Sequence, residues 1–290
     1  LETSLSRLIG DHMNKYHSKH TLMIDHLTLL VKDIDQSLTF YQQTLGLDLI
    51  QVENKKHHLG VGHKILFTLI SNDHVVSKTK TTGLYHFALL MPQRSDLGSL
   101  LYHFHINKII VQGGADHGVS EAIYLSDPDG NGIEIYVDKK DASWPINQNG
   151  LTMISEPLPV EEIVQTRLTN QSFKMPLGAI IGHLHFHVKN LLEAKTFFID
   201  VIGFELMQAM TSAVFVSDDK YHHHLGFNIW NGTHILNRPD DMVGLVDYHL
   251  NVSVEKETAL IKRLNEHEIK IHHDEGERYF YDINHVKVSF

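Results

Sequence analysis

The hydrophobic residues of this chain change their spacing in an order that recurs along its length. Residues 23–31 (MIDHLTLLV) alternate apolar and β-branched residues between faces, which predicts a strand. Residues 33–46 start on an aspartate, place apolar residues on one helical face and stop at a glycine, which predicts an amphipathic helix. Short apolar runs at 47–53, 58–62 and 64–70 predict three antiparallel strands. This stretch is therefore expected to form a β-α-β-β-β unit.

A second unit with the same order of elements is expected from residue 82. Its helix and strands are predicted over 95–107, 109–111, 120–125 and 132–137. Residues 126–132 (SDPDGNG) join the last two strands and predict a tight turn, because Asp, Pro, Gly and Asn supply the backbone angles that turns need.

A duplication is visible in the second half of the chain. Residues 180–201 (IIGHLHFHVKNLLEAKTFFIDV) repeat the pattern of residues 23–44. A third unit is therefore expected over 179–237 and a fourth over 244–290. Four copies of one motif are strong evidence for a repeat architecture.

The four βαβββ modules predict an α+β fold in which they pair into two domains with curled mixed sheets. Units one and two are expected to form an N-terminal domain over 23–138, and units three and four a C-terminal domain over 179–290. Residues 139–178 are rich in proline and predict a surface linker. Residues 1–22 form a leader, of which 1–12 have no periodic pattern and are interpreted as a cloning remnant before Met13.

Composition narrows the class of protein. The 290 residues are 42% hydrophobic, enough for two buried cores. A net charge of −10 without a basic segment argues against nucleic acid as a partner. No apolar run approaches the ~18–20 residues that span a bilayer, so no membrane partner is expected. The protein is expected to be cytoplasmic. The chain has no cysteine, so any metal must use nitrogen and oxygen ligands, and its 24 histidines are the first candidates.

Two histidines and a glutamate have positions that suit a metal ion. His26 lies on the first strand of unit one, His86 on the first strand of unit two and Glu134 on the last strand of unit two. Two imidazoles and one carboxylate leave coordination positions open and suit ferrous iron. A structural role explains one histidine in this register more readily than one in every unit. The predicted metal site is therefore His26, His86 and Glu134, in the N-terminal domain.

The second half is expected to carry a degenerate site. An alignment of its last strands on 124–137 puts Lys287 near the place of Glu134, and a cation there would repel a divalent ion. His183 and His249, which are aligned with His26 and His86, are then inherited remnants or packing residues. The roles of His222, His223 and His224 stay open between a polar cavity, the domain interface and an exposed edge strand.

Residues 115–136 (ADHGVSEAIYLSDPDGNGIEIY), with the repeated units and histidine strands, resemble the vicinal oxygen chelate superfamily, specifically its two-domain extradiol, or catechol 2,3-, dioxygenases. The resemblance covers nearly the whole chain from Ile24 onward and implies two glyoxalase-like domains. It implies an oxidoreductase of aromatic hydrocarbon catabolism that opens a small aromatic diol with Fe(II) and O2. Many such enzymes hold iron in the C-terminal domain, whereas the complete set is expected here in the N-terminal one.

The resemblance also implies roles for individual residues. His26, His86 and Glu134 would bind iron; Tyr124 would hydrogen-bond a substrate oxygen; and His117 would act as an acid or base. His58, with His57, resembles a further active-site histidine pair. The alternative roles are a loop position for His117 and a cross-strand aromatic contact for Tyr124.

Other functions fit the same fold. A glyoxalase-like isomerase or thiol transferase would use zinc, nickel or manganese and often two carboxylates, whereas one is visible here. A metal-free protein that binds small molecules would carry the histidines as vestiges. Fe(II) is the expected cofactor, with Mn(II), Zn(II) or Ni(II) as alternatives in the protein as prepared, and homo-oligomerisation stays open.

Overall fold

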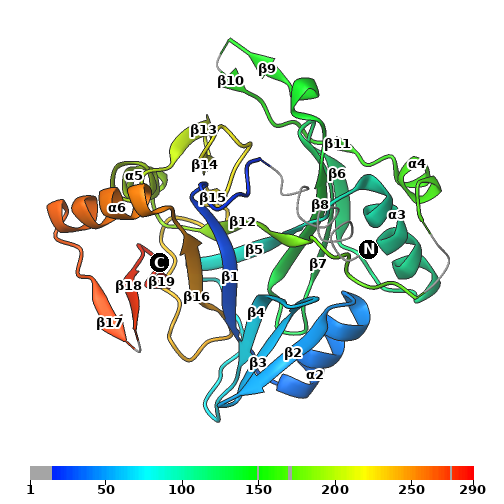
Figure 1. The fold of residues 1–290 in the computed structure, drawn as a ribbon, viewed down its shortest axis with the longest axis horizontal. Helices are drawn as coiled ribbons and strands as arrows, with labels where there is room; N and C mark the ends of the chain where they lie inside the picture. Colours follow the sequence, from blue (N-terminus) through cyan, green and yellow to red (C-terminus); the bar gives the residue numbers. More distant parts are fainter. Residues whose placement is uncertain (1–14, 149, 169–171, 275) are drawn as a thin grey trace, which may run out of the picture.

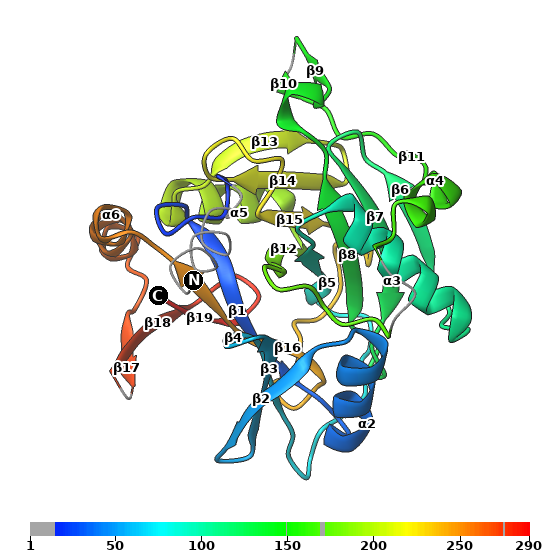
Figure 2. The same ribbon diagram turned by 45° about the vertical axis from the view of Figure 1, so that its right-hand side comes forward.

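The computed structural model describes residues 15–148, 150–168, 172–274 and 276–290. Figure 1 and Figure 2 show its ribbon in two views. The segment 1–12, interpreted above as a cloning remnant, lies outside the described residues. Within the described part, no helix is both long and apolar enough to cross a lipid bilayer.

The elements follow the predicted order closely. Unit one contains β1 (Met23–Leu30), α2 (Ile34–Thr39), the π-helical η1 (Phe40–Thr44), β2 (Asp48–Glu53), β3 (Lys56–Val61) and β4 (Lys64–Ile70). Unit two contains β5 (Gly83–Leu90), α3 (Arg94–Ile106), β6 (Gly113–Asp116), β7 (Ser120–Ser126) and β8 (Gly132–Asp138). The strand expected around 109–111 is found at β6 instead.

The second half repeats this plan. Unit three contains β12 (Ile180–His187), α5 (Leu191–Thr196), the π-helical η3 (Phe197–Ile202), β13 (Glu205–Ala209), β14 (Ala213–Ser217) and β15 (Leu225–Asn228). Unit four contains β16 (Gly244–Asn251), α6 (Val254–Glu266), β17 (His272–Asp274), β18 (Glu277–Tyr281) and β19 (Lys287–Ser289). The connection between the halves carries η2 (Asp141–Ser143), β9 (Ile146–Asn147), β10 (Gly150–Leu151), β11 (Glu156–Pro157) and α4 (Val160–Gln165).

Polar residues after the first strands set where the helices begin. The side chain of Asp33 accepts a hydrogen bond from Gln36 N, and that of Asn190 accepts from the amides of the first turn of α5. Ser253 caps α6 in the same way, and Gln93 forms a capping box with α3. These bonds satisfy amides that have no partner inside the helix. The local sequence therefore specifies each strand-to-helix turn.

The units pair differently from the expectation. In the described chain, an eight-stranded sheet has the order β17-β18-β19-β16-β1-β4-β3-β2, and a nine-stranded sheet has the order β11-β6-β7-β8-β5-β12-β15-β14-β13. Units one and four thus share the first sheet, and units two and three share the second. The first strands of all units have similar patterns, so the pattern leaves their pairing open. The predicted pairing of unit one with two, and of three with four, is not the one that the sheets show.

The apolar faces of the two sheets and the helices form one core. β1 packs beside β12, and Figure 1 shows α5 and α6 on one side of the molecule and α3 and α4 on the other. Leu27, Phe87 and Leu184 point into this core and are fully buried. The residues that alternate with them, among them His86 and His183, lie on the opposite faces of the strands. The packing of the sheets therefore directs the histidines away from the apolar core.

We predict that Phe67 couples the two sheets. It is fully buried on β4, and its ring centroid lies 5.0 Å from that of Phe87 on β5. Phe67→Ala should lower the free energy of unfolding by about 3–5 kcal/mol, because it leaves a cavity between the sheets. Ile110→Ala, at a side chain that is 87% exposed, should change it by less than about 0.5 kcal/mol. Urea denaturation measures both, and equal effects would contradict the role of Phe67.

Candidate metal centre

His86, Glu134 and His183 meet on one face of the nine-stranded sheet. β5 carries His86 and is flanked by β8, which carries Glu134, and by β12, which carries His183. Ala88 pairs with Glu134 on one side and with His183 on the other. Its small side chain points to the same face as His86 and leaves room for the three larger ones. All three are buried.

The three donor atoms have the spacing of ligands around one ion. Glu134 Oε2 lies 3.2 Å from His86 Nε2 and 3.3 Å from His183 Nε2, and the two Nε2 atoms lie 3.3 Å apart. Atoms bound to one metal ion at about 2.1 Å lie roughly 2.9–3.5 Å from one another in tetrahedral or octahedral geometry. The residues present therefore fit a divalent first-row metal held from one side.

The charge state of the cluster also suits a metal ion. Burial alone would raise the pKa of the Glu134 carboxyl, but the charges and hydrogen bonds of His183 and His86 outweigh it, so this pKa lies well below its ordinary value. Burial lowers the pKa of His183 to about 4, although Glu134 opposes the shift. At neutral pH the carboxylate is ionised and His183 is neutral, as metal ligands must be.

The structure corrects one member of the predicted ligand set. His26 lies on β1 in the other sheet, where its Nε2 is 2.8 Å from Thr68 Oγ1. His183, interpreted from the sequence as a remnant, lies beside His86 and Glu134 instead. The reason is that β5 pairs with the first strand of unit three and not with β1. The candidate ligands therefore come from both halves of the chain.

The eight-stranded sheet has other side chains at the corresponding positions. The strand registers show which position of this sheet is equivalent to which position of the nine-stranded sheet. The equivalent pairs are His26 and His183, Asp247 and His86, His249 and Ala88, Ser289 and Glu134, and Lys287 and Gly132. The alignment that superposed His249 on His86 and Lys287 on Glu134 is thus displaced by two residues. Within the described residues, the metal-ligating atoms of this sheet do not converge as those of the candidate centre do.

His58 also belongs to the eight-stranded sheet. It lies on β3 with its Nδ1 2.9 Å from Thr68 Oγ1, the hydroxyl that His26 also contacts. Both histidines line a cleft of about 890 Å³, in which Lys287 Nζ lies 3.3 Å from a carboxylate oxygen of Asp247. The structure therefore does not bring His58, expected among the catalytic residues, to the candidate metal centre.

Tyr124 and His117 form a hydrogen-bonded pair beside Glu134. Tyr124 lies opposite Glu134 in the β7–β8 pair, and its hydroxyl is 2.6 Å from His117 Nε2. His117 Nδ1 lies 2.8 Å from the Ile154 carbonyl oxygen, which can only accept, so the proton of a neutral ring is on Nδ1. The Tyr124 hydroxyl therefore donates to His117 Nε2. Burial, followed by Glu134, raises the pKa of Tyr124, so its phenol stays protonated.

A second histidine chain approaches the centre from the other side. His222 Nε2 lies 2.9 Å from an Asp138 carboxylate oxygen, and its Nδ1 lies 2.8 Å from His223 Nδ1. If a neutral His222 donates to Asp138, His223 donates to His222 and keeps an unprotonated Nε2. The His223 ring centroid lies 4.0 Å from that of His183. Sequence reasoning left these residues open, because their HHH run shows no periodicity that points to a site.

We predict that metal retention depends on His183 and not on His26. His183→Ala and Glu134→Gln should each lose bound metal through dialysis, because the first removes a nitrogen ligand and the second removes the negative charge of the carboxylate. His26→Ala and His249→Ala, at the matching strands of the other sheet, should retain it. Metal analysis of the dialysed proteins tests this, with circular dichroism to check folding. Loss of metal from His26→Ala with retention in His183→Ala would reverse the assignment.

The buried His17 should make the metal-free protein sensitive to acid. Its Nε2 donates to the Gly182 carbonyl oxygen at 3.0 Å, and burial lowers its pKa to about 4. In the unfolded chain the His17 imidazole binds a proton near pH 6.5. The contribution of His17 to the free energy of unfolding is therefore complete above pH 6.5 and is lost as the pH falls toward 4. At pH 5 the loss from His17 is about 2 kcal/mol relative to pH 7.

His17→Gln keeps a donor for Gly182 but removes the titrating group. Its loss of stability between pH 7 and pH 5 should be smaller than that of the unmodified protein by about 2 kcal/mol. Urea denaturation in the presence of a chelator measures this difference. The same pH dependence in both proteins would show that His17 does not contribute.

Comparisons with known proteins agree with this fold. The family model of the Glyoxalase/Bleomycin resistance protein/Dioxygenase superfamily matches residues 23–135. The chain is 36% identical over 250 residues to the catechol-2,3-dioxygenase of Bacillus subtilis (strain 168), covering 84% of this chain and 87% of that protein.

Solved structures share the architecture at low sequence identity. A Bacillus subtilis protein provisionally described as a dioxygenase superposes with a TM-score of 0.60 at 13% identity, covering 94% of this chain and 85% of that one. Maize (Zea mays) glyoxalase I superposes with a TM-score of 0.57 at 16% identity, covering 93% and 91%. At these identities the likeness shows the fold. Together with the matches in sequence, it shows that this chain belongs to the Glyoxalase/Bleomycin resistance protein/Dioxygenase superfamily.

Proposed function

We propose that this protein is an Fe(II)-dependent extradiol dioxygenase that cleaves the ring of catechol-type aromatic diols. The observation that carries the proposal is the cluster of two imidazoles and one carboxylate, with the Tyr124–His117 pair beside it. The 36% identity to a catechol-2,3-dioxygenase supports the same reaction class. The cluster contains one carboxylate among the described residues, which favours this reaction over the metal-dependent isomerase alternative.

A ferrous ion held by His86, Glu134 and His183 would supply open coordination positions for the diol oxygens and for dioxygen, together with the electron transfer that ring cleavage needs. Glu134 contributes the negative charge that makes this position attractive to a cation. His183 contributes a neutral nitrogen donor, and His86 contributes a second nitrogen atom. Buried residues surround the cluster, and burial strengthens the interactions of every charge in it.

Aromatic side chains form a wall beside the cluster. The ring centroid of His185 lies 5.0 Å from that of His86, 5.6 Å from Phe215 and 5.4 Å from Trp230. Tyr85 contacts the same group, with its ring centroid 5.3 Å from that of Trp230. Flat faces and edges of this kind favour a planar aromatic ligand. The wall would orient the substrate ring next to the metal ligands.

Two groups can move protons at this site. When His222 donates to Asp138 and accepts from His223, the Nε2 of His223 is unprotonated and can accept a proton from a substrate hydroxyl. On the other side, Tyr124 holds a proton that it can donate to an oxygen on which negative charge develops. His117 can supply or accept a proton through Tyr124. The acceptor and the donor thus stand on different sides of the cluster.

Oxygen uptake by the iron-loaded protein tests the reaction class. We expect anaerobically loaded protein to consume O2 with catechols and to form a ring-opened semialdehyde, detected by its absorbance. Zinc-loaded protein is the control and should consume no O2, because zinc has no accessible redox change. No uptake with any catechol, with iron retained, would remove the dioxygenase proposal.

Tyr124→Phe should separate proton donation from metal binding. It removes one hydroxyl and should lower kcat by about 10²-fold, while iron content stays unchanged. Tyr281→Phe, in the cleft of the other sheet, is the matched control and should keep full activity. Steady-state oxygen uptake with catechol measures both variants. An unaltered kcat in Tyr124→Phe would exclude the hydroxyl from the rate-limiting chemistry.

A further inference from the structure

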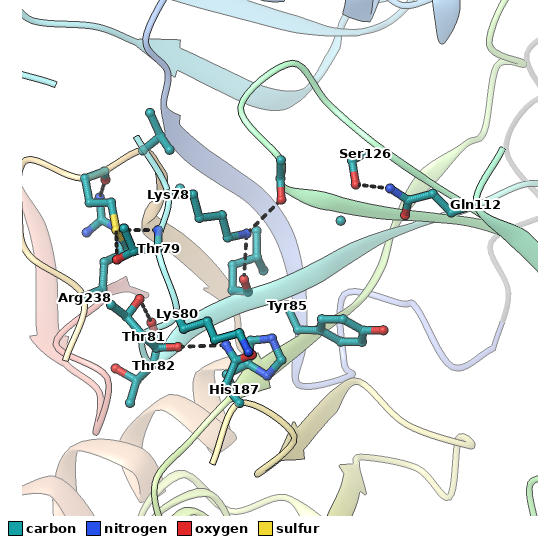
Figure 3. Close-up of a pocket in the computed structure, with 17 residues that line it drawn as sticks. Lys78, Thr79, Lys80, Thr81, Thr82, Tyr85, Gln112, Ser126, His187 and Arg238 are labelled. Carbon is teal, nitrogen blue, oxygen red and sulfur yellow. Dashed lines mark hydrogen bonds between the residues drawn. The ribbon is translucent and has the colours of Figure 1, made fainter. Parts of the chain in front are cut away.

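A cationic cavity lies next to the aromatic wall of the candidate centre. It has a volume of about 240 Å³, and Figure 3 shows the side chains that surround it. Lys78, Lys80 and Arg238 line it, together with polar groups that include Thr82 and His187. Among the described residues that line the cavity there is no aspartate or glutamate. Its lining therefore has an excess of positive charge, although the whole chain has a net charge of −10.

Two buried polar atoms of the lining have no hydrogen-bond partner in the part of the chain that the structure describes. Thr82 is 4% exposed, and its Oγ1 has no hydrogen-bond partner among the described residues. Arg238 Nε is also buried and, within the described chain, without a partner. Asp240 and Asp241 act on Arg238 through space, but in the described residues neither forms an ion pair with it. A buried donor without an acceptor is costly, and a bound acceptor would remove that cost.

Lys78 likewise forms no ion pair within the described residues, although Asp127 and Asp129 act on it through space. Its Nζ donates to the carbonyl oxygens of Leu84 and Gly130 and to Asn131 Oδ1, which are neutral acceptors. Burial, against the opposing charges of Asp127 and Asp129 and with a contribution from Arg238, lowers its pKa to about 8. Lys78 thus contributes charge to the cavity, whereas Thr82 and Arg238 each contribute a buried polar atom that has no partner within the described residues.

Tyr85 connects this cavity to the metal centre. A register irregularity at Tyr85 interrupts the β5–β12 pairing, since His185 pairs with His86 whereas Phe186 pairs with Leu84. A bulge of this kind turns neighbouring side chains toward one face. The Tyr85 ring centroid lies 5.0 Å from that of His86 and 4.8 Å from that of His187. One aromatic ring therefore contacts a candidate metal ligand and also lines the cavity.

We propose that this cavity binds the carboxylate of a side chain on the substrate ring, so that the enzyme acts on catechols with an anionic substituent. The proposal rests on the proposed ring-cleaving function, because it places the ring of such a substrate against Tyr85 and the metal centre. Arg238 Nε and the Thr82 hydroxyl would donate to the carboxylate, and Lys80, which is exposed, would contribute charge at the edge of the cavity. Because the volume of the cavity is about 240 Å³, a carboxylate fits in it more readily than a bulky group does.

Binding of ligands that cannot be cleaved tests the pocket independently of turnover. We would titrate the full chain with 4-hydroxyphenylacetate and with its amide by isothermal calorimetry, since the two differ in charge but hardly in shape. The acid should bind at least about tenfold more tightly, which corresponds to 1.4 kcal/mol. The preference should fall severalfold in Arg238→Met, in Thr82→Val and in the exposed Lys80→Met, whereas affinity for the amide should stay unchanged.

Lys262→Met, on α6, is the matched control for loss of one surface charge and should keep the preference. Equal affinity for acid and amide, or a preference that survives in the Arg238, Thr82 and Lys80 variants, would overturn the proposal. Lys80→Met keeps the test decisive if a buried variant fails to fold, because this side chain is exposed.

Two further measurements separate the possible failures. Inorganic phosphate should compete with the acid but not with the amide; phosphate binding without any preference for the acid would identify a site for a free anion and overturn the proposal. Oxygen uptake of the iron-loaded protein should show a higher kcat/KM for 3,4-dihydroxyphenylacetate than for its amide. Uptake with equal kcat/KM would overturn this inference alone, whereas a binding preference without uptake would overturn the proposed function alone.

Discussion

The main-chain hydrogen bonds between β5 and β12 are the constraint on which the candidate metal centre depends. This antiparallel pairing joins the first strand of unit two to that of unit three and sets His183 opposite Ala88. β8 lies on the other side of β5 and sets Glu134 opposite the same alanine. Three donor atoms then converge without any loop having to hold them. A centre built on adjacent strands is rigid, because its spacing follows from the ladder of the sheet.

Burial gives this geometry its electrostatic character. The sheets pack through Phe87, Leu184 and their neighbours, so the histidine faces of the inner strands point to the other side. There, an ionised Glu134 lies beside His86 and beside His183, which burial keeps neutral. A buried carboxylate of this kind is costly unless positive charge compensates it. The site therefore favours a cation because its ionised carboxylate is buried.

The two sheets show how one framework can carry different chemistry. Where the nine-stranded sheet has His86 and Glu134, the eight-stranded sheet has Asp247 and Ser289. There the charge of Asp247 is balanced by Lys287 from a neighbouring strand. The duplicated units thus compensate a carboxylate on an inner strand in two different ways. One uses a cation from the chain itself, and the other has the donor set to bind a cation from solution.

Local sequence patterns determined most of the elements and part of the site. Caps such as Asp33 and Asn190 and the alternation of each first strand act over a few residues, so β1, β5, β12 and β16 could be located before the structure was known. The alternation also shows which side chains leave the core, which is why His86 and Glu134 could be proposed as ligands. Tyr124 was found through the resemblance of its segment to a known family.

Only the tertiary structure decided which histidine joins His86 and Glu134. The first strands of all units have the same alternation, and this pattern states which face is buried but not which strand lies alongside. The choice of His183 over His26 comes from the long-range pairing of β5 with β12. The contacts of His222 and His223 likewise depend on a loop that returns to Asp138, far away in the sequence. The sequence by itself thus determined the units and their polar faces, and long-range hydrogen bonding and packing decided how those faces combine into a site.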